Sequence, residues 1–292
     1  MIAQQVASKA ARDGFFLEQV SVQWLPLMMV FGSAVSLVVA VLVGRALSTF
    51  SPARVAPLLY ALSGTLYLAE AFAVDRFPKV VAVVLFLHTM GLGAAVVSGF
   101  WSVVNESFDP YAARRAVGRI VVGTTLGGAM GGGLTWLASD FEFRWLLAAF
   151  SASSFVCSVG VAAVARRGAA SPERATRTTQ PLFAGVDAVL RSPYLRIIAF
   201  LVFSLAATTS VVDFVFKAET AKAGAGSLIG FFAVFYTATG IATFVVQALL
   251  SKRVLQGLGV VPGVTILPIA IALFGGLALL SPELGTLTLL RA

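Results

Sequence analysis

Long uninterrupted apolar stretches constrain the fold of this chain more than any other feature. Eight stretches approach the roughly 20 residues that a helix needs to cross about 30 Å of hydrocarbon. They lie at residues 25–43, 56–74, 80–104, 117–138, 145–165, 196–216, 227–250 and 260–280, with a partial helix before the first. Only 12% of the residues are charged, against about a quarter in soluble domains. The sequence predicts an all-α, polytopic membrane helix bundle.

The distribution of basic residues argues against a nucleic-acid partner, although the net charge is +8. Thirteen basic residues fall in alternate loops and only five in the others. The larger set is Arg45, Arg54, Arg114, Arg115, Arg119, Arg166, Arg167, Arg174, Arg177, Arg191, Arg196, Lys252 and Arg253; the smaller is Arg76, Lys79, Arg144, Lys217 and Lys222. Because cytoplasmic loops are enriched in Lys and Arg, the larger set predicts the cytoplasmic side. We expect a multi-pass protein of the bacterial cytoplasmic (inner) membrane.

Soft metal ligands and catalytic groups are scarce. Cys157 is the single cysteine and His88 the single histidine, too few for a typical zinc, haem or iron–sulfur site. The sequence has no His-Glu-x-x-His motif and no nucleophile beside a plausible base. We therefore expect no cofactor, no metal and no enzymatic activity.

An internal repeat divides the chain into two halves. Residues 13–17 (Asp-Gly-Phe-Phe-Leu) resemble residues 213–217 (Asp-Phe-Val-Phe-Lys), and residues 30–34 resemble residues 234–238 at nearly the same offset. Parallel repeats of this kind occur in major-facilitator transporters. We expect an N-terminal bundle at 1–165 with an incomplete first helix, a basic cytoplasmic linker at 166–195, and a partial C-terminal bundle at 196–292. The comparison of the halves predicts a fragment with about eight full spans of a twelve-helix fold.

Ionisable side chains within the predicted spans are the main functional signal, since each is costly at the bilayer centre without a partner or a water-filled cavity. Asp213 and Lys217 stand four residues apart and share one helix face. Arg12 and Asp13 occupy the equivalent place in the first half. If the halves face each other, these charges meet near the midplane, where transporters bind substrate. The alternative is that both pairs lie at the outer interface in water.

A second candidate pattern follows the fourth predicted helix. Glu106 ends that helix, Asp109-Pro110 interrupts it, and Arg114, Arg115 and Arg119 open the next one. Clustered guanidinium groups bind phosphate through bidentate hydrogen bonds. Arginines in an inner loop are also what membrane orientation alone requires.

Glycines and two further ionisable residues complete the candidates. Gly123, Gly127 and Gly131 form a smooth stripe, joined by Gly128 and Gly132, which favours close helix packing. No phosphate-binding loop is indicated, because neither a strand nor a Gly-Lys-Ser/Thr motif accompanies these glycines.

His88 and Glu70 are two further ionisable residues within predicted spans. For His88, hydrogen-bonded packing is favoured over a proton relay, whereas Glu70 is costly in lipid unless it is protonated or paired.

Several short motifs together resemble the ATP/ADP-translocase type of nucleotide transporter. They are residues 12–17 (Arg-Asp-Gly-Phe-Phe-Leu), 100–106 (Phe-Trp-Ser-Val-Val-Asn-Glu) before 113–115 (Ala-Arg-Arg), and 192–196 (Ser-Pro-Tyr-Leu-Arg) ahead of 212–217 (Val-Asp-Phe-Val-Phe-Lys). The resemblance covers most of the chain. It implies a twelve-helix, major-facilitator-like fold and exchange of ATP for ADP, or uptake of nucleotides.

By position, the resemblance also implicates Arg12, Asp13, Glu106, Asp213 and Lys217 in transport. At the substrate-binding site we expect Arg12, Lys217 and Arg119 to hold the phosphate groups, and Asp13, Glu106 and Asp213 to form charge pairs that exchange between open states. Arg12 and Asp213 replace the lysine and glutamate expected in the family, which affects the nucleotide specificity. The sequence thus predicts a secondary transporter of nucleotide or a related organic phosphate in the lipid bilayer. The alternatives are a major-facilitator transporter of another organic anion or drug-like solute, and a non-transporting membrane anchor or signalling module.

Overall fold

The computed structural model describes residues 1–107, 110–168, 189–224 and 227–257, together with residues 273, 288 and 291. All regular elements in these ranges are helices. They are α1 (Ile2–Gln19), a short 3-10 helix η1 (Val22–Trp24), α2 (Leu25–Thr49), α3 (Pro52–Ala73), α4 (Pro78–Ser107), α5 (Pro110–Leu137), α6 (Phe143–Gly168), α8 (Pro193–Ala223) and α9 (Leu228–Gly257). The predicted span at 260–280 and most of the predicted linker at 166–195 lie outside the described residues.

Prolines set the starts of several helices. Pro52, Pro78, Pro110 and Pro193 each occupy the first position of a helix, where the missing amide hydrogen costs nothing. Ser192 precedes α8, and its hydroxyl accepts a hydrogen bond from the Leu195 amide at 3.4 Å. These four helices begin two to seven residues before the apolar stretches that predicted them.

The outer surface of the described helices is apolar, and the interior holds charged side chains as well as apolar ones. Six described helices (α2, α3, α4, α6, α8 and α9) are long and apolar enough to cross a membrane. Large apolar side chains such as Leu37, Phe200 and Phe203 are exposed on the outside, whereas Asp13 and Lys217 are buried. Apolar surface outside and paired charges inside are what a bilayer requires. The chain is a multi-pass helical membrane protein.

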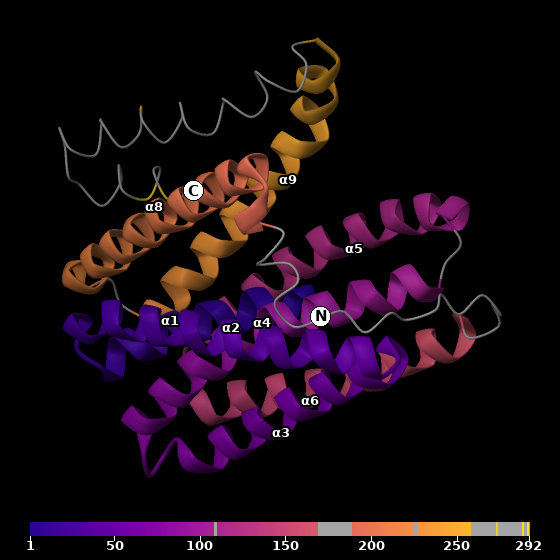
Figure 1. The fold of residues 1–292 in the computed structure, drawn as a ribbon. Coiled ribbons are helices and arrows are strands. Elements are labelled where there is room, and N and C mark those ends of the chain that lie inside the picture. The colour runs from indigo at the N-terminus through magenta and orange to yellow at the C-terminus, as the bar shows by residue number, and fades with distance from the viewer. Residues whose placement is uncertain are drawn as a thin grey trace.

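Helix α1 lies at the centre of the packing. It contacts α4 and α5, which belong to the predicted first half, and α9, which belongs to the predicted second half. Figure 1 shows α3 and α6 on one side of α1, with α8 and α9 on the other. The first half is held together by α3 against α4 and α6, and by α2 against α4. Residues of α1 are therefore in position to contact both halves.

The glycine stripe of α5 packs closely, as the sequence predicts. A Cβ on Gly131 would overlap the backbone of Ala3 in α1, and one on Gly132 would overlap the side chain of Thr237 in α9. Gly127 and Gly128 also face α1. Gly123 has no neighbour within 4 Å among the described residues, so it adds nothing to this close approach. The stripe sets the spacing of α5 against α1 and α9.

Candidate anion-binding site

The buried carboxylate of Asp13 is the hub of a charge cluster between the two halves. Its Oδ1 lies 2.7 Å from Nη2 and 2.8 Å from Nε of Arg12. Its Oδ2 accepts a hydrogen bond of 2.6 Å from the hydroxyl of Tyr236 in α9 and lies 3.1 Å from Nζ of Lys217 in α8. The Asp13 side chain is completely inaccessible to solvent. A fully desolvated carboxylate needs several close donors to remain charged, and Arg12, Tyr236 and Lys217 supply them here.

Lys217 joins the two sequence-related segments. Its ammonium group lies 2.7 Å from Oδ2 of Asp213 and 3.1 Å from Oδ2 of Asp13. The other oxygen of Asp213 lies 2.8 Å from Nε of Arg291. The aspartates of the two repeat segments therefore share one cation, and a chain of ion pairs runs from Arg12 to Arg291.

A glycine next to Asp13 allows this assembly. A Cβ on Gly14 would lie 2.5 Å from the backbone nitrogen of Ile229, near the start of α9. Real Cβ atoms do not approach backbone so closely, so only glycine lets α9 cross α1 at this point. On the same side of α1, Ala10 packs against Phe232 and Tyr236. The close crossing brings the Tyr236 hydroxyl within reach of Asp13.

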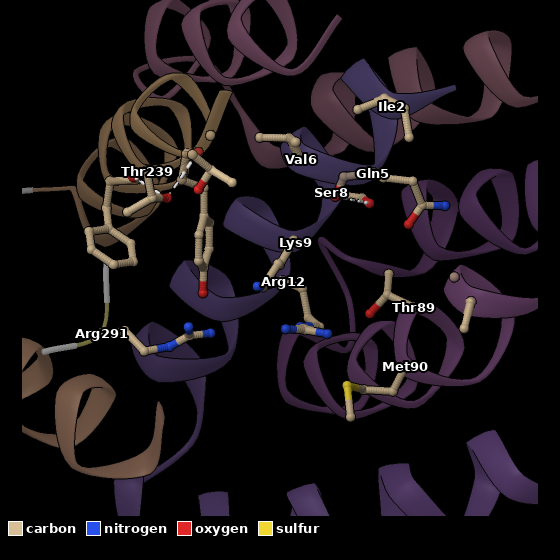
Figure 2. Close-up of a pocket in the computed structure, with 16 residues that line it drawn as sticks. Ile2, Gln5, Val6, Ser8, Lys9, Arg12, Thr89, Met90, Thr239 and Arg291 are labelled. Atoms are coloured by element: carbon tan, nitrogen blue, oxygen red, sulfur yellow. Dashed lines mark hydrogen bonds between the residues drawn. The ribbon is translucent and has the colours of Figure 1, made fainter. Parts of the chain in front are cut away.

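A cavity of about 610 Å³ adjoins the cluster. α1, α4 and α9 supply most of its wall, and Figure 2 shows Lys9 and the guanidinium groups of Arg12 and Arg291 beside the same space. Gln5, Ser8, Thr89, Thr239 and Thr243 add polar groups to the wall. Among the described residues, the charged side chains that line the cavity are all cationic, and neither Asp13 nor Asp213 lines it. The wall is therefore suited to an anion.

The cluster does not neutralise itself. Lys9, Arg12, Lys217 and Arg291 supply four positive charges, and Asp13 and Asp213 supply two negative ones. Lys9 lies 4.2 Å from the ring centre of Tyr236, and no described carboxylate forms an ion pair with it. Among the described residues, two positive charges therefore remain for a bound anion to balance.

The structure brings together four of the six residues that the sequence singles out. Arg12, Asp13, Asp213 and Lys217 meet in the cluster. Glu106 is exposed near the end of α4 and does not line the cavity. Arg119 belongs to α5, but its side chain lies outside the described part of the chain.

Sequence reasoning misses three members of the site. Lys9 stands one helical turn before Asp13 and shares its face, a spacing that identifies it in retrospect. Tyr236 lies inside the repeated segment 234–238, but nothing in the repeat marks its hydroxyl. Arg291 has no periodic or repeated context, so only the fold reveals it.

Comparisons of the chain with family models, with curated proteins and with solved structures gave no match. The function is therefore inferred from the chemistry of the site.

Proposed function

We propose that the chain is a secondary transporter that moves a nucleotide or a related organic phosphate across the membrane by alternating access. The supporting observation is the cavity wall, whose charged side chains in the described part of the chain, Lys9, Arg12 and Arg291, are all cations. Cations buried in a membrane protein mark the path of a charged substrate. The cavity is also within the size range of small-molecule sites, about 300–1,000 Å³.

Phosphate fits this wall better than a single carboxylate does. Arg12 and Arg291 carry planar guanidinium groups, which bind phosphate oxygens in pairs, and Lys9 adds a compact charge. The surplus of two positive charges suits an anion with more than one negative charge. The motifs that resemble the ATP/ADP-translocase family point to the same substrate class.

The cluster provides a mechanism for alternating access. Lys217 binds Asp13 across the two halves and Asp213 within its own helix. If the halves separate, Lys217 keeps Asp213 as a partner, and Asp13 keeps Arg12. Lys217 and Asp13 then each keep an ion-pair partner, which lowers the free-energy cost of separating the halves. We infer that the halves are the two parallel bundles of a major-facilitator-type fold.

Binding and exchange of labelled ATP, ADP and inorganic phosphate by the purified chain in liposomes test this proposal. Lys9→Gln removes surplus charge without leaving an aspartate unpaired, so we expect the Kd for ATP or ADP to rise about tenfold or more. Lys217→Gln is expected to abolish exchange. The matched control is Lys222→Gln, since Lys222 is exposed on the same helix and pairs only with Glu219 among the described residues.

The three ligands separate the substrate classes. Tight binding of ATP or ADP together with weak binding of inorganic phosphate supports a nucleotide. Equal binding of all three restricts the claim to the phosphate group. If the folded protein binds none of them but takes up a non-phosphorylated organic anion, phosphate specificity is wrong, although anion transport stands.

A further inference from the structure

A second group of buried polar side chains lies between α3 and α4. Ser63 and Glu70 belong to α3 and His88 to α4, and 7%, 3% and 7% of these residues is exposed. Nδ1 of His88 lies 2.9 Å from Oε1 of Glu70, and Nε2 lies 3.0 Å from Oγ of Ser63. None of the three lines the anion cavity. The site described above therefore does not account for them.

The hydrogen bonds of this group are incomplete at one atom. Both ring nitrogens of His88 are paired, but Oε2 of Glu70 is buried and has no hydrogen-bond partner among the described residues. An ionised carboxylate with an unpaired buried oxygen is costly in a medium of low dielectric constant. One proton shared between the imidazole and the carboxylate makes the pair neutral, and its loss leaves one net negative charge. The pair is suited to holding one exchangeable proton.

Among the described residues around Glu70 and His88, no second acid–base pair is placed to bind that proton. On α3, the Tyr67 ring lies 4.5 Å from the His88 ring, and the hydroxyl of Tyr60 is buried without a partner. On α1, the Arg12 guanidinium lies 5.0 Å from the Phe86 ring and pairs with Asp13. Residues 25–44 of α2 contain no charged side chain, and in residues 145–165 of α6 the one titratable group is Cys157. His88 is therefore the partner that decides the charge of Glu70.

The pair adjoins the anion cavity through α4. Thr89 and Met90 line the cavity and directly follow His88 in the chain. Arg12 also connects the two sites, since it lines the cavity and lies over Phe86, two residues before His88. A change of charge at Glu70 and His88 therefore acts on the same helix that contacts the anion.

We propose that Ser63, Glu70 and His88 form a proton-binding site that couples anion movement through the cavity to the transmembrane proton gradient. The coupling rests on the proposed transport function. A proton from water on one side of the membrane binds the pair, which changes from one net negative charge to neutral. The same proton returns to water on the other side after the halves have moved. Ser63 holds the imidazole in place through Nε2.

The single histidine allows a direct test of the proton site. With ¹⁵N-labelled histidine and an affinity tag free of histidine, nitrogen NMR of the chain in lipid reports on His88 alone. We expect the ring to change between its neutral and doubly protonated forms between about pH 5 and pH 8. In Glu70→Gln we expect the ring to stay neutral over this range, because no carboxylate remains to balance the imidazolium. Glu142→Gln, which removes an exposed carboxylate, is the control.

Transport measurements test the coupling. A gradient of one pH unit sustains at most about tenfold accumulation when one proton accompanies each anion and the membrane potential is clamped. We expect this accumulation of labelled ADP in proteoliposomes with the wild-type chain and its loss in Glu70→Gln. Exchange of ADP for ADP without a gradient should persist in the variant, which shows that it is folded.

Each result decides one claim. A His88 ring that keeps one neutral tautomer from about pH 5 to pH 8 in the wild-type chain overturns the proton site and leaves anion transport intact. Titration of His88 together with gradient-independent accumulation supports proton binding and overturns the coupling. If no phosphate compound binds or moves, the proposed function fails, and the NMR result still decides whether the site binds a proton.

Discussion

Asp13 differs from Asp213 in how completely its charge depends on neighbouring side chains. Both oxygens of Asp13 are buried, and three side chains from α1, α8 and α9 contact them. The Asp213 side chain is 13% exposed and pairs with Lys217 and Arg291. Removing one member of a buried ion pair leaves the other charge uncompensated, and this penalty is larger where water has no access.

Neutralising the two aspartates separately should therefore have unequal effects on stability. We expect Asp13→Asn to lower the free energy of unfolding by about 3–5 kcal/mol and Asp213→Asn to lower it clearly less. Thermal unfolding in detergent, followed by the fluorescence of the four tryptophans, measures both variants. Equal losses of stability would contradict the assignment of Asp13 as the hub.

At the residue scale, sequence reasoning identifies the buried charges and the meeting of Asp213 and Lys217 with Asp13, but not the other partners. Arg12, Asp13, Asp213 and Lys217 stand out because ionisable groups within apolar spans are rare and costly. Glu70 and His88 stand out for the same reason, yet 18 residues separate them, and only the packing of α3 on α4 pairs them. The contact of Arg291 with Asp213 spans 78 residues and has no local signal.

At the scale of the helix, small residues and prolines determine the packing that the site needs. The hydropathy pattern predicts the described helices α2 to α6, α8 and α9, but it places the starts of α3, α4, α5, α6 and α8 two to seven residues late, because first turns that contain proline or polar residues are not apolar. The glycine pattern of α5 predicts close packing correctly, since the spacing of four residues places glycines on one face. The pattern does not identify the partners of that face, α1 and α9, because no local feature of α5 encodes them.

Two neighbouring glycines of α5 provide a matched test of this packing. Alanine at position 131 would overlap the backbone of Ala3, whereas alanine at position 133 would meet nothing within 4 Å. Both substitutions gain the same helix propensity, up to about 1 kcal/mol. We expect Gly133→Ala to keep or raise the melting temperature in detergent and Gly131→Ala to lower it. A stabilised Gly131→Ala variant would show that the close contact of α5 with α1 is not required.

At the scale of the whole molecule, the cavity extends toward one end of the bundle. From Tyr236 its wall continues along α9 to Thr243, and along α1 it continues from Arg12 to Ile2. The chain after Thr243 leads to the basic pair Lys252-Arg253, which belongs to the predicted cytoplasmic set. At the other end, Phe15 stacks on Phe143 at 3.9 Å, and Gly14 adjoins the start of α9. In the proposed transporter, these contacts of the described residues close the end opposite the predicted cytoplasmic side, as expected of an inward-facing state.

Labelling from each side of the membrane tests this orientation. After Cys157→Ser removes the native cysteine, Thr243→Cys places a thiol in the cavity wall and Ser227→Cys places one in the turn before α9. We expect a membrane-impermeant maleimide to label position 243 from the cytoplasmic side and position 227 from the opposite side. ATP or ADP should slow the labelling at position 243 only. Labelling of position 243 from the outer side would contradict the inward-facing assignment.

Two of the contacts between the halves converge on a single atom, Oδ2 of Asp13, which binds both the Lys217 ammonium group and the Tyr236 hydroxyl. A shift of α1 that carries this oxygen away breaks both bonds in the same event, so partly released arrangements gain little stability. If the chain is the proposed transporter, its conformational cycle should then populate two well-separated states with few intermediates, and the barrier between them should set the turnover number.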